Sequence, residues 1–222
     1  MSAAFTGWPA AALDFYRELE DNNTRAWWQA HKSTYENDVR GPMLALADAV
    51  VDEFGPMHVF RPNRDVRFAK DKSPYKTACA AITEGEGGTG YYLQLSATGL
   101  MVAAGYYVMA TDQLERFRAA VDDTRAGPAV ARVVDALGKK RYEVGAHDEL
   151  KTAPRGYPKD HPRIELLRRK GLIGFKTFPP AKWLSTRAAR DRIVGVWREL
   201  GPMAAWLDKH VGPSTLPPPE PR

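Results

Sequence analysis

The spacing of hydrophobic and polar positions predicts helices at both ends of the chain and strands in its middle. Apolar residues recur every three or four positions over residues 10–20, 25–40, 42–54, 112–125, 129–137, 162–170, 185–200 and 202–210, as in helices that bury one face. Gly41 and Pro42 indicate a break between the second and third of these helices. Aromatic and aliphatic runs over 91–96, 100–107 and 172–178 are typical of strands. Shorter strands are expected around Ile82 and over 141–144 and 148–151.

The order of these elements predicts an α+β fold. Residues 97–99 form a short connection of the kind that joins two antiparallel strands. Helices flank the strands instead of alternating with them, so we expect a single domain with an antiparallel or mixed central sheet packed with helices. This domain is expected over residues 5–210, and the proline-rich stretch 211–222 is expected to be a disordered tail.

Composition indicates the cellular compartment in which we expect the protein. No apolar run approaches the roughly 18 residues that span a bilayer, and the N-terminal residues do not have the pattern of a secretory signal. Cys79 is the only cysteine, which excludes an intrachain disulfide and a zinc site built from several thiolates of one chain. We therefore expect a cytoplasmic protein without membrane association, and the sequence leaves its oligomeric state open.

Positive charge is concentrated in two segments. The chain has 32 Lys and Arg against 27 Asp and Glu, a net charge of +5. Segment 61–76 has six basic and two acidic side chains, and segment 151–170 has seven and two, so their net charges are +4 and +5. The rest of the chain is therefore mildly acidic, with a net charge of −4. Such local excess predicts focused contacts with an anion.

The first segment has the side chains of an anion clamp. Arg64 and Arg67 offer planar forks for phosphate or carboxylate, and Lys70, Lys72 and Lys76 add point charges. Asp65 and Asp71 are placed to orient the arginines, while Tyr75 and Thr77 are possible hydrogen-bond donors. Strand-like alternation would put Arg64, Val66 and Phe68 on one side, and Asp65 and Arg67 on the other. The structural alternative is a network of ion pairs around a turn at Ser73 and Pro74.

The second segment offers Arg155 and a histidine at an expected helix start. Asp160, His161 and Pro162 precede the apolar pattern of 162–170, where free amides and an imidazole suit anion binding or proton transfer. In the structural alternative, Asp160 caps the helix and His161 packs against it. The candidates for orienting a ligand or transferring a proton are thus Asp65, Asp71, Tyr75 and His161.

Other patterns indicate less chemistry. Residues 85–90 match G-x-G-x-x-G, but they lead into a strand, where a dinucleotide fingerprint opens a helix, so we expect a flexible loop. Small neighbours of Cys79 favour simple burial. His31 and Tyr35 share a helix face, which fits either a pocket or the core. The five histidines are scattered without metal-ligand spacing. We therefore predict neither a metal nor a cofactor.

Several blocks together resemble a bacterial and fungal family known only as domain of unknown function 2461. The blocks are residues 21–25 with Trp28, His31, Lys32, Tyr35 and Glu36; residues 64–77; residues 91–93 and 103–107; and residues 154–157, 160–162, Leu166 and Leu167. The resemblance covers roughly residues 5–205. It implies a single family domain and no particular activity.

Three hypotheses for function remain open. The leading one is a basic pocket that binds a small anionic or phosphorylated ligand, possibly in an enzyme of unknown reaction. The second is a nucleic-acid-associated protein whose basic segments follow phosphates; the carboxylates among the cations make it less favoured. The third is a structural or partner-binding domain without chemistry. Under the first hypothesis the two basic segments are expected to meet in space.

Overall fold

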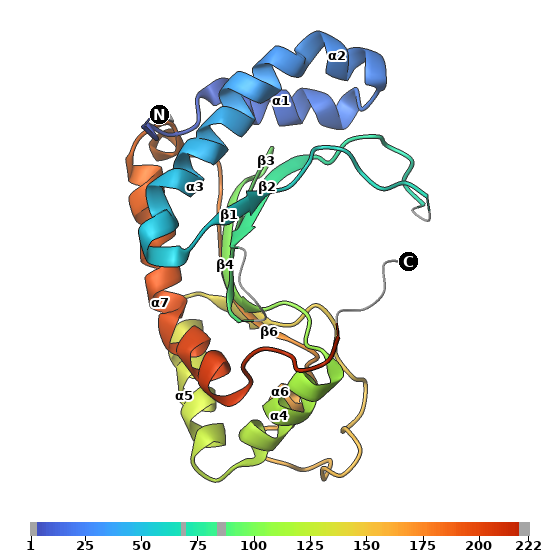
Figure 1. Ribbon diagram of the computed structural model, residues 1–222, viewed down its shortest axis with the longest axis vertical. Helices are drawn as coiled ribbons and strands as arrows, with labels where there is room; N and C mark the ends of the chain where they lie inside the picture. Colours follow the sequence, from blue (N-terminus) through green and yellow to red (C-terminus); the bar gives the residue numbers. More distant parts are fainter. Residues whose placement is uncertain (1–3, 68–69, 84–87, 218–222) are drawn as a thin grey trace. The chain divides into compact units, whose positions relative to one another are not determined.

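The computed structural model describes residues 4–67, 70–83 and 88–217 and has the expected α+β architecture (Figure 1). Its strands form an open antiparallel sheet in the order β1-β2-β3-β4-β6-β5. The strands are β1 (Met57–Val59), β2 (Ala78–Thr83), β3 (Gly90–Ser96), β4 (Gly99–Tyr106), β5 (Glu143–Gly145) and β6 (Leu172–Phe178). The helices are α1 (Ala10–Asp21), α2 (Arg25–Thr34), α3 (Gly41–Phe54), α4 (Thr111–Asp122), α5 (Ala126–Lys139), α6 (Ile164–Arg168) and α7 (Ala188–His210). A π-helix, η1 (Tyr35–Arg40), and a 3-10 helix, η2 (Lys182–Ser185), complete the elements.

The fold contains two compact units, which we describe separately. Unit 1 comprises Met1–Glu84, Tyr92–Val102 and Thr177–Val196, and unit 2 comprises Gly85–Tyr91, Ala103–Lys176 and Trp197–Arg222. The first basic segment belongs to unit 1 and the second belongs to unit 2.

In unit 1, helix α3 packs on strands β1 and β2, and α1 and α2 pack on each other and on η1 (Figure 1). The Thr24 hydroxyl accepts a hydrogen bond from the Trp27 amide and so caps the start of α2. Phe15 contacts Trp28 edge-on, with ring centroids 5.5 Å apart. The ring centroid of Trp28 lies 4.8 Å from that of Tyr35, and Tyr35 is 1% exposed. This buried cluster joins α1, α2 and η1.

The predicted helix break at Gly41 and Pro42 is wrong. Helix α2 continues through the π-helix η1 directly into α3, and Gly41 has ordinary helical dihedral angles. Proline lacks the amide that an α-helix uses at each turn. Here the Gly41 amide bonds to the Glu36 carbonyl, five residues back, and this wider turn accommodates Pro42 without ending the helix.

The strand pattern of unit 1 follows the sequence closely. β2 pairs with β3 in antiparallel register, with Cys79 opposite Leu95 and Ala81 opposite Leu93. These four side chains are buried, whereas their neighbours along each strand are half-buried. The expected connection at 97–99 joins β3 to β4. Gly99 has a φ of +116° and lies against the Phe178 carbonyl, where a Cβ atom would not fit. β1 was not predicted, because three residues are too few to show a period.

Unit 2 packs α4, α5 and α6 around Phe117, Val130 and Leu167. The expected helix over 162–170 is shorter, because α6 spans only Ile164–Arg168. Its N-cap position is Arg163, with no side-chain cap, so Asp160 does not cap this helix as the structural alternative had it. The expected break before Pro202 is also wrong, since α7 runs through it.

The expected tail begins in the structure as a docked segment. The side chain of Arg116 on α4 donates to the carbonyls of Val211 and Pro213, at 2.5 and 2.7 Å. Asp112 accepts from the Ser214 hydroxyl and the Thr215 amide, at 2.7 and 2.8 Å. Residues 211–215 are therefore held against α4. Residues 218–222 lie outside the described residues.

Candidate functional site

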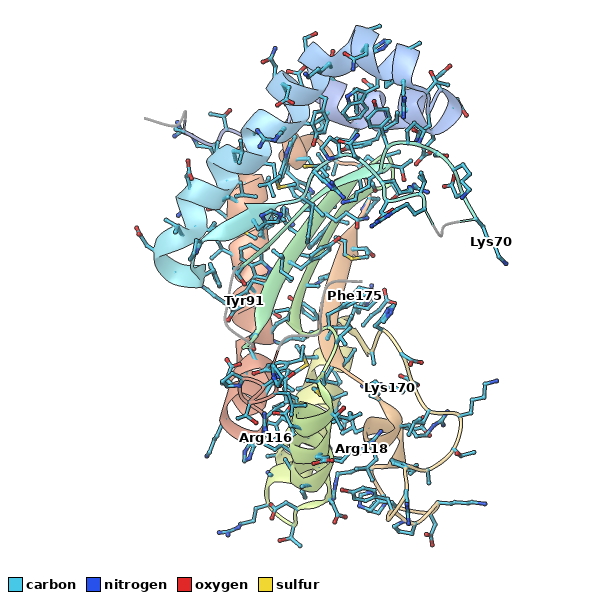
Figure 2. The ribbon with its side chains drawn as sticks, turned by 45° about the vertical axis from the view of Figure 1, so that its right-hand side comes forward. Lys70, Tyr91, Arg116, Arg118, Lys170 and Phe175 are labelled. Carbon is cyan, nitrogen blue, oxygen red and sulfur yellow. The ribbon has the colours of Figure 1, made fainter. Side chains whose placement is uncertain are left out.

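The first basic segment forms an arm, residues 60–77, that extends beyond β1 and β2. Its base is a short antiparallel pairing, with Asn63 opposite Tyr75. The Arg64 amide bonds to the Pro74 carbonyl and the Lys76 amide to the Pro62 carbonyl, at 2.9 and 2.8 Å. Figure 2 shows Lys70 at the outer end of the arm, pointing away from the strands. The arm is thus an exposed hairpin-like extension of unit 1.

Helix α2 anchors the base of this arm. The side chain of Asn23 donates to the Tyr75 carbonyl at 2.9 Å and accepts from the Tyr75 amide at 3.1 Å. The Tyr75 ring stacks on the indole of Trp28, with centroids 4.0 Å apart and planes 9° from parallel. Tyr75 is buried, at 6% exposure. Its ring therefore supports the arm. This buried position does not favour the expected role of Tyr75 as a hydrogen-bond donor to a ligand.

The two arginines of the arm pair with its two carboxylates. Arg64 bonds through Nη1 to Asp71. Arg67 donates two hydrogen bonds to Asp65, from Nη2 to Oδ2 at 2.7 Å and from Nε to Oδ1 at 3.0 Å. The predicted orienting role of both aspartates agrees with this geometry. The Asp65–Arg67 contact also agrees with the predicted alternation, while Phe68 lies outside the described residues.

Hydrogen bonds from neighbouring residues keep both carboxylates ionised. Hydrogen bonds from Arg67 lower the pKa of Asp65 to about 2. Bonds from the hydroxyl and amide of Ser73, with a smaller contribution from Arg64, lower the pKa of Asp71. A general acid or base needs a pKa near the working pH. Asp65 and Asp71 are therefore suited to orienting the arginines and unsuited to proton transfer near neutral pH.

The remaining cations of the arm keep their charge available. Lys72 and Lys76 donate to the main-chain carbonyls of Val66 and Arg61, at 2.9 and 3.0 Å, which neutralises neither. Lys76 also lies over the ring of Phe60, 5.3 Å from its centroid. Arg61 and Lys70 are exposed and have no ion pair among the described residues. The net charge of the arm therefore stays positive after its internal pairing.

Cys79 lies directly behind the arm but is inert. It is 2% exposed, and burial raises the pKa of its thiol to about 12. A thiolate is the reactive form, so this thiol is not a nucleophile at neutral pH. The expected burial of Cys79 is confirmed.

The second basic segment is largely tied into the fold of unit 2. Arg163 donates from Nε to the Val121 carbonyl at 2.6 Å and from Nη2 to the Asp122 carbonyl at 3.1 Å, at the end of α4. The three consecutive cations at 168–170 each face a carboxylate. They pair as Arg168 with Glu165 at 3.3 Å, Arg169 with Glu149 at 3.4 Å, and Lys170 with Asp148 at 2.5 Å. Arg155 is exposed and unpaired within the described residues.

Both ring nitrogens of His161 are engaged. Nδ1 accepts a hydrogen bond from the Arg163 amide at 3.0 Å, so the ring proton lies on Nε2, which faces the Asp122 carboxylate at 3.1 Å. The side chain is 8% exposed. This arrangement fits the structural alternative, in which His161 packs and holds the loop before α6.

His31 differs from His161 because one nitrogen stays open. Its Nδ1 bonds to the Trp27 carbonyl at 2.8 Å, which identifies Nδ1 as the donor, and its ring stacks on the Trp27 indole at 3.9 Å. Nε2 makes no hydrogen bond within the described residues and lies 4.0 Å from a carboxylate oxygen of Glu18, on a side chain that is 36% exposed. The i,i+4 spacing to Tyr35 indicated a shared face but not which nitrogen would be open.

The glycine-rich stretch leads into a strand. Gly90 begins β3, and the Thr89 amide bonds to Asp208 at 2.9 Å, while residues 84–87 lie outside the described residues. No helix follows this stretch, so its match to a dinucleotide fingerprint has no structural support. Across the described residues, no cluster of three or more His, Cys, Asp or Glu side chains could hold a metal ion.

The family model described as "Conserved hypothetical protein (DUF2461)" matches residues 11–206. The chain therefore belongs to this family, and the resemblance noted in the sequence is confirmed. Comparisons with curated proteins and with solved structures found no match. Within the described part of the chain, no helix combines the length and apolar character needed to cross a membrane.

Proposed function

We propose that this protein binds a small anionic or phosphorylated ligand through the arm of unit 1, with Arg67 as the principal contact. Arg67, Lys70 and Lys72 lie in the outer part of the arm, and Arg64 and Lys76 lie at its base. No reaction is proposed, because the carboxylates of the arm remain ionised, and Tyr75 of the arm and the neighbouring Cys79 of β2 are buried.

The observation that carries the proposal is the geometry of Arg67. A guanidinium has five N–H donors along two usable edges. Asp65 occupies the edge formed by Nε and Nη2, and the side chain is nevertheless 70% exposed. The end formed by Nη1 and Nη2 thus keeps three donors for a ligand. Because Asp65 already holds the fork in place, less conformational entropy is lost when an oxyanion binds.

Nucleic acid is a second candidate, and the open shape of the arm is the observation that favours it. An extended polyanion could follow the exposed cations, whereas a small ligand needs them to converge. The two candidates differ in their response to salt. A contact with about six phosphates loses roughly a thousandfold in affinity between 50 and 200 mM salt, and a single phosphate contact loses far less.

The proposal is tested by comparing Arg67→Gln with Arg17→Gln. Arg17 is also exposed and also pairs with an aspartate, Asp14, so the control removes an equivalent charge outside the arm. Titration calorimetry with pyrophosphate should show an affinity reduced about three- to tenfold in Arg67→Gln and nearly unchanged in Arg17→Gln. Amide NMR shifts should place the perturbation on residues 61–77.

Equal affinities for the two variants would contradict the proposal and favour a structural network of ion pairs. Titration with single- and double-stranded oligonucleotides at both salt concentrations distinguishes the second candidate. Submicromolar binding at 200 mM salt with a steep salt slope would favour nucleic acid over a small ligand.

A further inference from the structure

Unit 2 contains a cleft that shares no residue with the arm. It lies between α4, the start of α5 and the end of α7, with a volume of about 720 Å³. This volume is within the range of sites for small ligands. Four alanines of α4 and α5 line it: Ala119, Ala120, Ala126 and Ala129. Their methyl groups form the apolar part of the walls, which favours an apolar part of a ligand.

The charged side chains around this cleft are mostly basic. Arg116, Arg125 and Lys209 line it together with His210, and the acidic lining residue is Asp123. Even with His210 neutral, three cations face one carboxylate. Two of these groups hold the walls in place. Arg116, which is labelled in Figure 2, donates to the carbonyls of Val211 and Pro213. Asp123 accepts hydrogen bonds from the amides of Arg125 and Ala126, at 2.8 and 2.7 Å.

Arg125 and Lys209 are not used in this way. Both are exposed, and neither side chain has an ion pair or hydrogen bond among the described residues. Asp123 already occupies the first amides of α5, so the helix start itself offers little to a ligand. The free binding capacity of the cleft therefore lies in two side chains from different helices.

We propose that this cleft binds a small organic anion, a carboxylate or phosphate monoester attached to an apolar group. Arg125 and Lys209 contact the anionic group, and the apolar group packs on the alanines. The ring of His210, which lies 5.0 Å from that of Trp206, closes one side. The site is independent of the arm, because none of its residues belongs to unit 1.

The test uses phenyl phosphate on the full chain, with inorganic phosphate and benzyl alcohol as probes of each half of the ligand. Phenyl phosphate should bind most tightly, because only it uses both the cations and the methyl-lined walls. The variant R125Q/K209Q should weaken this binding about tenfold or more. The matched control R132Q/K159Q removes the same charge from exposed side chains outside the cleft, and should stay within about twofold of the unaltered protein.

Amide NMR shifts separate this site from the arm. Perturbations on residues 116–129 and 206–210 that disappear in R125Q/K209Q and persist in Arg67→Gln support the cleft. Three results would overturn the proposed cleft site. The first is no shift on these residues with about 10 mM phenyl phosphate, which would detect even a millimolar affinity. The others are an equal weakening in the control variant, or shifts confined to residues 61–77. The last result would leave the proposed function of the arm standing.

Discussion

The two basic segments look alike in sequence and differ in what their arginines bond to. In the arm, Arg64 and Arg67 pair with aspartates two to seven residues away, on an exposed loop. In the second segment, Arg163 and Arg168 donate to main-chain carbonyls at 2.6 Å and help close the fold of unit 2. Net charge alone therefore does not identify a binding segment. The partners of each guanidinium decide whether it is available to a ligand.

Replacing Arg163 should have the largest effect on stability. In Arg163→Met, the carbonyls of Val121 and Asp122 lose a charged donor, which should lower the free energy of unfolding by about 2–3 kcal/mol. Arg67→Met, by contrast, should leave stability unchanged within error, because its fork bonds only within an exposed loop. Urea unfolding at pH 7 measures both. A loss in Arg67→Met equal to that in Arg163→Met would remove the distinction between the segments.

A second variant tests the same bond from the other side. A Cβ atom at Gly127 would overlap the Val121 carbonyl oxygen and lie 2.5 Å from Nε of Arg163, so Gly127→Ala should disturb both partners of this bond. If Gly127→Ala is destabilising in the unaltered protein and much less so in Arg163→Met, the loss comes from the Arg163 contact. Additive losses would show that the overlap with the Val121 carbonyl accounts for the effect.

Asn23→Ala should have an intermediate effect, because Asn23 connects α2 to the arm. It removes two hydrogen bonds to the Tyr75 main chain, and we expect a loss of about 1–2 kcal/mol and faster hydrogen exchange at the Tyr75 amide. The control is Asn22→Ala, which removes an exposed hydrogen bond to the Glu18 carbonyl. Unchanged exchange at Tyr75 would mean that the stack on Trp28 alone positions the arm.

A double-mutant cycle tests whether the segments share a ligand. Arg155 is the predicted contact in the second segment, and its side chain is free within the described residues. If Arg67 and Arg155 hold one anion, the loss of pyrophosphate affinity in R67Q/R155Q should differ from the product of the single losses by about twofold or more. Multiplicative losses would assign the two arginines to separate sites and reject convergence of the basic segments.

Local patterns predicted the elements well, while the roles of charged residues depended on contacts between distant segments. The boundaries of β6 and the connection between β3 and β4 follow from apolar runs and from Gly99. The sequence did not show that a π-helix leads from α2 into α3, because a Gly-Pro pair ordinarily indicates a helix break and the bond from Gly41 to Glu36 leaves no periodic signal. The bonds from Arg163 to the end of α4 span about 40 positions, so no local pattern indicates them. Asp65 and Asp71 were predictable because their partners are close in sequence.

The smallest expected effect is the response of the arm to pH. The pKa of Asp65 is lowered to about 2 and that of Asp71 is also lowered, so both stay ionised in the folded protein from pH 8 down to pH 5. Sulfate keeps its charge over this range. The part of the sulfate affinity that is lost in Arg67→Gln should therefore stay constant between pH 5 and 8, and should rise only as pH falls below the ordinary aspartate range and the carboxylates begin to protonate. Calorimetric titrations at several pH values measure this difference.

A rise of about threefold or more in this part of the affinity between pH 8 and pH 5 would mean that a histidine contributes to the site. The open Nε2 of His31 would then be the first group to test, by His31→Gln, since both nitrogens of His161 are engaged.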